Sequence, residues 1–307
     1  MSKSVNLLGY YTRQSPITDP REYFYLFEGL PTDIPALCGV VQGVMIHRVS
    51  AKLRGVELTE KQKQDADLRH VSRLLARIRE LDDGPLTIPR PPQKRLAITC
   101  RDFATLMCAM LRHQGVPARA RCGFATYFRG PNSKPGFHVD HWVCEYWKSD
   151  EHRWILVDAE IDEVVREHDQ VTLDAHDVPR DQFLAAGQAW QLCRAGQANP
   201  DDFGIFDMRG LWYIVSQLVR DLVSLNKIEL LPWDCWGLSD IEEGGVPTAE
   251  DAVLLDRVAA LTLAGDEAFP EMRALYESNE HLRVPPIIRS YHDAGVLEID
   301  WAASATL

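Results

Sequence analysis

The stretch RLAITCRDFATLMCAMLRHQGVPARARCGF, residues 95–124, places a cysteine, Cys100, where an extended run gives way to a helix. Thr99 is a favoured N-cap residue, and Asp102 stands where the acidic residue of a capping box belongs. The apolar residues that follow at helical spacing are Phe103, Leu106, Met107, Met110 and Leu111. Gly115 is a typical helix end. We therefore expect a half-buried helix with a thiol in its first turn.

The surroundings of Cys100 favour a thiolate. A helix N-terminus and nearby cations both lower the pKa of a thiol, and the thiolate is the reactive form. The basic residues near it in sequence are Arg90, Lys94, Arg95, Arg101, Arg112, Arg119 and Arg121. Two interpretations stay open: these cations act on the site around Cys100, or Arg112, Arg119 and Arg121 pair with acidic partners elsewhere.

A nucleophilic thiol needs a base, and the segments HWVCEYW and RWILVD supply a candidate. Both have the β-branched and aromatic composition of strands, and KSDE between them predicts a hairpin. If Trp147 pairs with His152 and Glu145 with Trp154, then His141 lies opposite Asp158. Opposed residues share one face of a sheet, so the Asp158 carboxylate could orient the His141 imidazole.

The same segment allows a metal-site interpretation, because His138, Asp140, His141 and Cys144 lie close together in sequence. On a strand, however, positions 138 and 141 point to opposite faces, as do 141 and 144. The ligands would diverge, so we expect no metal here and no cofactor elsewhere.

The order Cys100, His141, Asp158 and the local motifs over about residues 93–162 resemble the transglutaminase-like superfamily of papain-type thiol enzymes. His141 and Glu145 keep the family's spacing of four residues, as do Trp154 and Asp158. Three positions depart from the pattern: Trp142 comes one place early, Ala159 stands where Pro is frequent, and Ile98-Thr99 stands where Gly is frequent.

The resemblance implies that Cys100 is the nucleophile, His141 the general base and acid, and Asp158 the orienting group. The reaction would be acyl transfer through a Cys100 thioester, with hydrolysis of an amide or peptide bond favoured. Amide-forming or cross-linking acyl transfer and a non-catalytic binding module are the alternatives. The expected partner is a peptide or small amide, with a substrate carboxylate that the basic residues near Cys100 would attract. The second oxyanion donor stays open: Gln93 could supply it or could be a surface residue.

Composition bounds the class of protein. The 307 residues suggest about two domains. The net charge of −12 disfavours nucleic acid or an anionic membrane as a partner. Seven scattered cysteines without C-x-x-C spacing disfavour a disulfide framework, and no apolar run is long enough to span a bilayer. The first twenty residues lack a secretory signal pattern. We expect a cytoplasmic protein; its oligomeric state stays open.

The predicted fold class is α+β. A papain-like or transglutaminase-like core would carry a small antiparallel sheet packed on the Cys100 helix, with helical segments before and after it. The amphipathic stretches TDIPALCGVVQGVMIHR and LTEKQKQDADLRHVSRLLARIRELD predict helices in the front part. We expect a catalytic domain over residues 1–175 and a mainly helical extension over residues 176–307.

Overall fold

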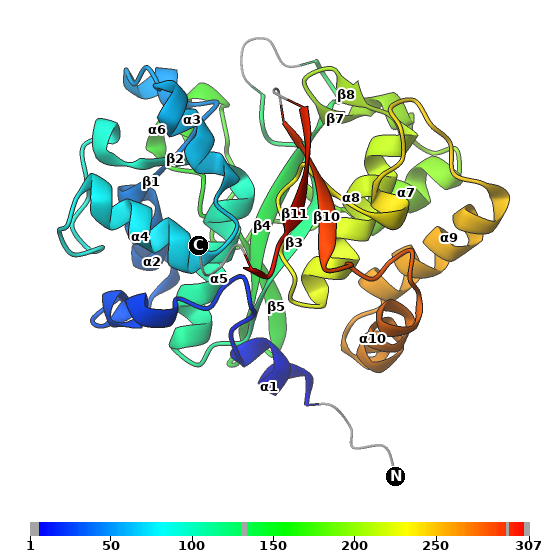
Figure 1. Ribbon diagram of the computed structural model, residues 1–307, viewed down its shortest axis with the longest axis horizontal. Helices are drawn as coiled ribbons and strands as arrows, with labels where there is room; N and C mark the ends of the chain where they lie inside the picture. The colour runs from blue at the N-terminus through cyan, green and yellow to red at the C-terminus, as the bar shows by residue number, and fades with distance from the viewer. Residues whose placement is uncertain (1–5, 130–133, 293–294, 304–307) are drawn as a thin grey trace. The chain divides into compact units, whose positions relative to one another are not determined.

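The computed structural model describes residues 6–129, 134–292 and 295–303, and the chain forms two compact units (Figure 1). Unit 1 takes the ranges Arg121–His141 and Arg180–Ala303, and unit 2 takes Leu8–Ala120 and Trp142–Pro179. Within the described ranges, no helix is long and apolar enough to cross a membrane. Two of the unit boundaries fall inside long strands, β3 (Ala118–Ala125) and β4 (His138–Lys148).

Unit 2 contains most of the N-terminal helices and the cysteine helix. Its α-helices are α1 (Leu7–Thr12, which begins on the last residue of a short piece of unit 1), α2 (Ile34–Val44), α3 (Glu60–Gln64), α4 (Val71–Leu81), α5 (Cys100–His113) and α6 (Glu163–His168). Its 3₁₀ helices are η1 (Arg21–Phe27), η2 (Ala51–Arg54), η3 (Asp65–Asp67) and η4 (Pro92–Lys94). Its short strands are β1 (Met45–His47), β2 (Leu96–Ile98) and β5 (Arg153–Val157).

Helix α5 is the centre of unit 2, and α2 and α4 both pack against it. All five apolar positions predicted from the sequence are buried, but so are the polar ones: every residue of α5 from Cys100 to Arg112 is buried. Gly115 ends the helix with φ +79°, and the N–H of Val116 bonds back to the Leu111 carbonyl at 2.9 Å. This left-handed turn and its backward bond are the usual helix stop at glycine.

Strands β3 and β4 are central in the main sheet, whose order is β6-β3-β4-β7-β8 with β5 on β4. Strand β5 runs antiparallel to β4, as the predicted hairpin requires, but the predicted register is wrong by two residues. Trp147 pairs with Trp154 and Glu145 with Leu156, and the ladder ends at Cys144 and Val157. The direct opposition of His141 and Asp158 is therefore wrong. A shift of two residues leaves each side chain on its predicted face.

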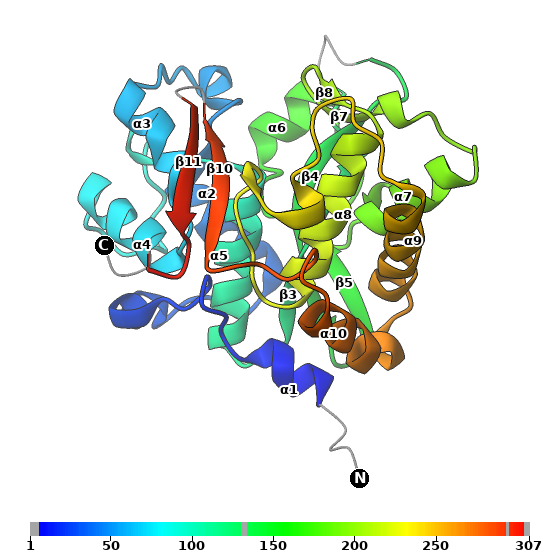
Figure 2. The same cartoon turned by 45° about the vertical axis from the view of Figure 1, so that its right-hand side comes forward.

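Unit 1 contains the C-terminal helices and the remaining strands. Helices α7 (Ala186–Arg194), α8 (Leu211–Leu225), α9 (Ala249–Leu263) and α10 (Phe269–Ser278) pack together in both views (Figures 1 and 2). Its 3₁₀ helices are η5 (Pro200–Asp202), η6 (Gly237–Ser239) and η7 (Asp266–Ala268). Its strands are β6 (Phe183–Ala185), β7 (Phe203–Ile205), β8 (Met208–Arg209), β9 (Asp234–Cys235), β10 (Ile287–His292) and β11 (Gly295–Asp300), and β9, β10 and β11 form a separate antiparallel sheet.

The α+β class with a transglutaminase-like core is confirmed, with local differences. The helix predicted to run on through Met45 ends at Val44, and β1 follows it. The long helix predicted after Leu58 is broken into α3, η3 and α4. The main sheet is mixed, because β4 pairs β7 in parallel. The division into domains 1–175 and 176–307 stays a prediction.

Candidate functional site

Cys100 is the first residue of α5, as the sequence predicts, and its side chain is 8% exposed. The preceding residue, Thr99, has extended backbone and acts as the N-cap. Asp102 completes the cap, because its Oδ2 accepts from the Thr99 N–H at 3.1 Å and from the Thr99 hydroxyl at 3.0 Å. The helix start is thus fixed by its own side chains, and the positive end of the helix dipole lies at the sulfur.

A buried ion pair stabilises the start of helix α5. The Arg101 guanidinium donates to Asp102 Oδ1 at 2.7 Å and to the Arg69 carbonyl at 2.6 Å, and both members of the ion pair are fully buried. Burial raises the pKa of the Asp102 carboxyl, while Arg101 and the Thr99 donors act in the opposite direction. The two residues after Cys100 therefore serve the architecture of the site.

The parallel pairing of two short strands, β1 and β2, places His47 close to Cys100. His47 is the last residue of β1 and pairs with Ile98 of β2, two residues before Cys100. The Val49 N–H donates to His47 Nδ1 at 3.2 Å, which orients the ring. The imidazole is therefore held at the same strand end from which α5 begins.

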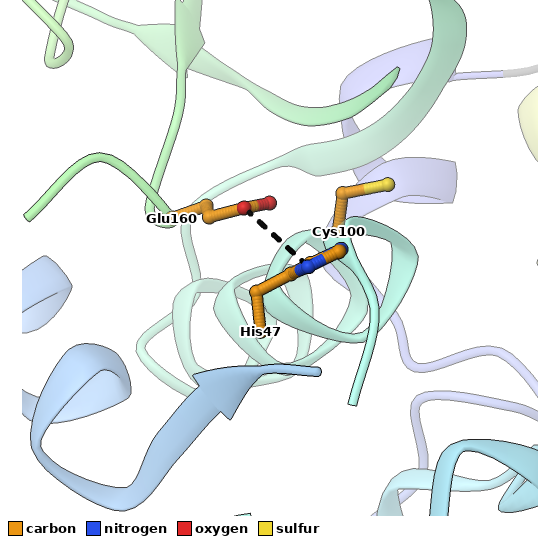
Figure 3. Close-up of side chains that lie close together, drawn as sticks. All are labelled: His47, Cys100 and Glu160. Carbon is orange, nitrogen blue, oxygen red and sulfur yellow. Dashed lines mark ion pairs between the residues drawn. The ribbon is translucent and has the colours of Figure 1, made fainter. Parts of the chain in front are cut away.

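Glu160 approaches from the loop after β5. Its backbone N–H donates to Asp158 Oδ1 at 3.0 Å, which shapes this loop. Glu160 Oε1 lies 4.0 Å from His47 Nδ1. Figure 3 shows the two side chains together with Cys100, and one ligand atom from each of the three lies within 4.8 Å of the other two. A thiol, an imidazole and a carboxylate are all metal-binding groups, so this cluster could hold a cation.

A small pocket lies beside the cluster. Its lining residues are Gln42, Met45, Ile46, His47, Ser50, Arg54, Phe103, Glu160 and Asp162. Arg54 Nη2 is 2.5 Å from Asp162 Oδ2, so the cation in the wall is neutralised by its neighbour. His47 and Glu160 therefore lie in the pocket wall next to the Arg54–Asp162 ion pair, which has no net charge.

The three residues of the predicted triad lie in the two units. Cys100 and Asp158 belong to unit 2, and Asp158 is buried, with its N–H bonded to the Ala175 carbonyl at 2.8 Å. His141 is the last residue of β4 that belongs to unit 1. Its ring makes edge contacts with Phe128 at 4.8 Å and Tyr127 at 6.0 Å between centroids. The triad stays a prediction.

Comparison with known proteins agrees with the geometry at Cys100. The sequence profile of the Transglutaminase-like superfamily matches residues 92–159, which include α5, β3, β4 and β5. The chain contains a transglutaminase-like domain. The match begins eight residues before Cys100 and ends one residue after Asp158.

A solved structure from Cytophaga hutchinsonii, described as a "putative cysteine protease", is also similar to this chain. The sequence identity is 15% and the TM-score is 0.31. The similarity covers 61% of this chain, and the chain spans about half the length of that protein. No curated protein matches the chain.

Within the transglutaminase-like domain, Glu145 has a clear structural partner. Its Oε2 accepts from Arg119 Nε at 2.5 Å, and the carboxylate is fully buried. The Arg119 guanidinium also lies over the Trp154 ring, 3.9 Å from its centroid. The Glu four residues after His141 thus ties β4 to β3, and the Trp four residues before Asp158 covers the same cation.

The basic residues near Cys100 are likewise engaged. Arg119 and Arg121 have acidic partners, as the second interpretation expects, whereas Arg112 donates to a carbonyl and a hydroxyl oxygen. Arg121 makes two bonds to the buried Asp221 carboxylate, at 2.9 and 2.8 Å. Arg90 donates to the Asp82 carbonyl, and Lys94 donates to the Asp82 carboxylate. Arg95 donates to the Arg90 carbonyl. Arg112 donates to the Ala118 carbonyl and to the Thr18 hydroxyl. A carboxylate on the substrate stays a prediction, but Arg101 and Arg121 are structural.

His138, Asp140 and Cys144 are close together in the sequence of β4, but their side chains contact different partners. The His138 ring stacks on Phe203 with centroids 4.4 Å apart. The Tyr213 hydroxyl donates to Asp140 Oδ2 at 2.8 Å, and burial raises the pKa of Asp140 to about 6. Cys144 Sγ lies 3.3 Å from Cys108 Sγ.

Sequence reasoning missed His47 and Glu160. His47 lies 53 positions before Cys100 in the sequence. The two are brought together by the parallel pairing of β1 with β2, which, unlike a hairpin, has no turn motif in the sequence to indicate it. Glu160 follows Asp158 by two residues in VDAEID, but both lie beyond the end of β5, so the alternation of a strand gave no signal for it.

Proposed function

We propose that this protein is a cysteine-dependent amide hydrolase of the transglutaminase-like type. Cys100 is the nucleophile, His141 the general base and acid, and Asp158 the group that orients the imidazole. The observation that carries the proposal is the placement of Cys100 at the first position of a capped 14-residue helix inside the transglutaminase-like domain. A helix N-terminus favours the thiolate, which is the attacking species.

The reaction follows from these roles. The Cys100 sulfur attacks the carbonyl carbon of an amide after His141 takes the thiol proton. The carbonyl oxygen becomes an oxyanion, which N–H donors at the helix start would stabilise. The C–N bond then breaks, and the amine leaves with the proton from His141. Water, activated by His141, cleaves the thioester and returns the free thiol.

Hydrolysis is favoured over transfer of the acyl group to a second amine. Both reactions share the thioester and differ only in the second nucleophile. No segment of the sequence is recognisable as an amine-donor site. Water is therefore the simplest acceptor.

The test is a screen of peptides and small amides with the wild type, Cys100→Ala, His141→Ala and Asp158→Asn. We expect turnover by the wild type, none by Cys100→Ala, and a rate at least about 100-fold lower for His141→Ala. The matched control is Cys193→Ser, a half-buried thiol on α7, which should keep wild-type turnover. Turnover that persists in Cys100→Ala would reject the proposal. Formation of a new amide between the substrate's acyl group and an added amine would favour acyl transfer.

A further inference from the structure

We propose that Cys100, His47 and Glu160 form a binding site for a divalent transition-metal ion, with zinc the best match. A metal ion bound there would hold the Cys100 sulfur as a coordinated thiolate and prevent its use as a nucleophile. The binding site stands on the geometry of the cluster alone. Its effect on turnover rests on the proposed function.

The distances among the three side chains suit one small cation. Ligand atoms of the three lie within 4.8 Å of one another, and the His47–Glu160 pair is already at 4.0 Å. Zinc bonds of about 2.0–2.3 Å in tetrahedral geometry place ligand atoms roughly 3.3–3.8 Å apart. Side-chain rotations that draw the groups together by about 1 Å would complete the contact.

The ligand types select the metal. A thiolate and an imidazole are poor ligands for calcium or magnesium, which prefer oxygen, but both are common ligands of zinc. Three protein ligands leave a fourth position for water. The charges also balance: the thiolate and the carboxylate of Glu160 together neutralise a doubly charged ion. Binding releases the Cys100 thiol proton to solvent and forms one sulfur–metal bond.

The surroundings hold one of the ligands in place. Asp158 Oδ1 accepts the backbone N–H of Glu160 at 3.0 Å, and outer contacts of this kind position metal ligands in general. A metal ion on His47 Nδ1 would take the place of the Val49 N–H that donates to this nitrogen. His47 and Glu160 both line the small pocket. The side chains of His47 and Glu160 retain 14% and 8% exposure.

The first test measures binding itself, with zinc and cobalt ions as probes on the full chain after chelator treatment. We expect one zinc ion per chain and, with cobalt, a thiolate-to-cobalt charge-transfer band. Cys100→Ser should abolish the band, and His47→Ala and Glu160→Gln should each weaken zinc binding at least about 10-fold. The matched controls are Cys193→Ser, His168→Ala and Glu167→Gln, which should bind as the wild type does. Circular dichroism checks that each variant is folded.

The second test measures protection of the thiol in the wild type. One equivalent of zinc should slow alkylation of Cys100 by iodoacetamide at least about 10-fold, and a chelator should restore the rate. Equal alkylation rates with and without zinc, absence of the cobalt band, or zinc binding that survives all three substitutions would overturn the site. Because no substrate is used, this result is independent of whether the proposed amide hydrolysis is found.

Discussion

Arg101 and Asp102 form an ion pair at 2.7 Å, fully buried, in the first turn of the helix that presents Cys100. Two charges removed from water cost free energy that is regained only if both keep their partners. Asp102 also accepts two bonds from Thr99, the N-cap. The position of the thiol therefore depends on one carboxylate that ties together the cap, the helix start and a buried cation.

Removal of that carboxylate should be costly. We expect Asp102→Ala to lower the free energy of unfolding by about 3–5 kcal/mol, because the buried Arg101 guanidinium loses its counter-charge. Chemical denaturation measures the change. Asp83→Ala is the matched control, since Asp83 pairs with Arg79 on the surface and should cost about 1 kcal/mol or less. Similar losses for the two variants would contradict the assigned role of Asp102.

The Arg119–Glu145 pair should behave as one unit. Arg119→Met leaves the buried Glu145 carboxylate without its cation, and we expect a loss of about 3–5 kcal/mol. The double variant Arg119→Met/Glu145→Leu should be more stable than that single variant, because no charge is left unpaired. A double-mutant cycle in urea measures the coupling. The exposed pair Arg257–Glu271 serves as the control, with coupling below about 1 kcal/mol; additive losses at Arg119 and Glu145 would refute the coupling.

His70 should make stability depend on pH. Its pKa is lowered to about 3, first by burial and then by the nearby Arg101 and Arg21. The unfolded side chain titrates near 6.5, so between these values the unfolded chain binds a proton that the folded chain does not. The stability that comes from keeping His70 neutral is therefore fully present above pH 6.5 and is lost as the pH falls from 6.5 towards 3.

The measurement compares the wild type with His70→Phe. As the pH falls from about 7.5 to about 5, the wild type should lose roughly 2 kcal/mol more unfolding free energy than His70→Phe. Among the described residues, neither ring nitrogen of His70 has a hydrogen-bond partner, so the substitution itself should be tolerated. His168→Phe, at an exposed position, should follow the wild-type curve. Parallel curves for the wild type and His70→Phe would show that His70 does not titrate as described.

Thiol reactivity should single out Cys100. Burial raises the pKa of Cys38 to about 12 and that of Cys193 to about 11, and it also raises the pKa of Cys144. Cys100 lies at a helix N-terminus, where a thiolate is favoured. We expect iodoacetamide at about pH 6 to label Cys100 well before the other thiols. Peptide mapping of the labelled chain measures this, and uniform slow labelling would argue for a binding module without catalysis.

Local signals were enough to predict α5, and long-range pairing was not. Thr99, Asp102 and Gly115 act within a few residues of the helix ends, so their effect can be read from the sequence. The pairing of β1 with β2 joins segments about 50 residues apart, and nothing near His47 indicates its partner. The place of His47 beside Cys100 is therefore a product of tertiary structure.

The hairpin shows a smaller failure of the same kind. Its strands were predicted from their composition, but the register depends on the turn. His152 has a positive φ of 49°, and Lys148 still pairs with Arg153, so the connection is Ser149–His152. The prediction used His152 as a strand residue, which shifted every pair by two positions.

The most direct test of the account is intact-mass analysis of the enzyme quenched in acid during turnover of an amide substrate found in the screen. The account predicts an added acyl mass on the wild type that maps to Cys100, is lost on treatment with hydroxylamine, and is absent from Cys100→Ala. An acyl adduct on another residue, or turnover of the same substrate by Cys100→Ala, would contradict it.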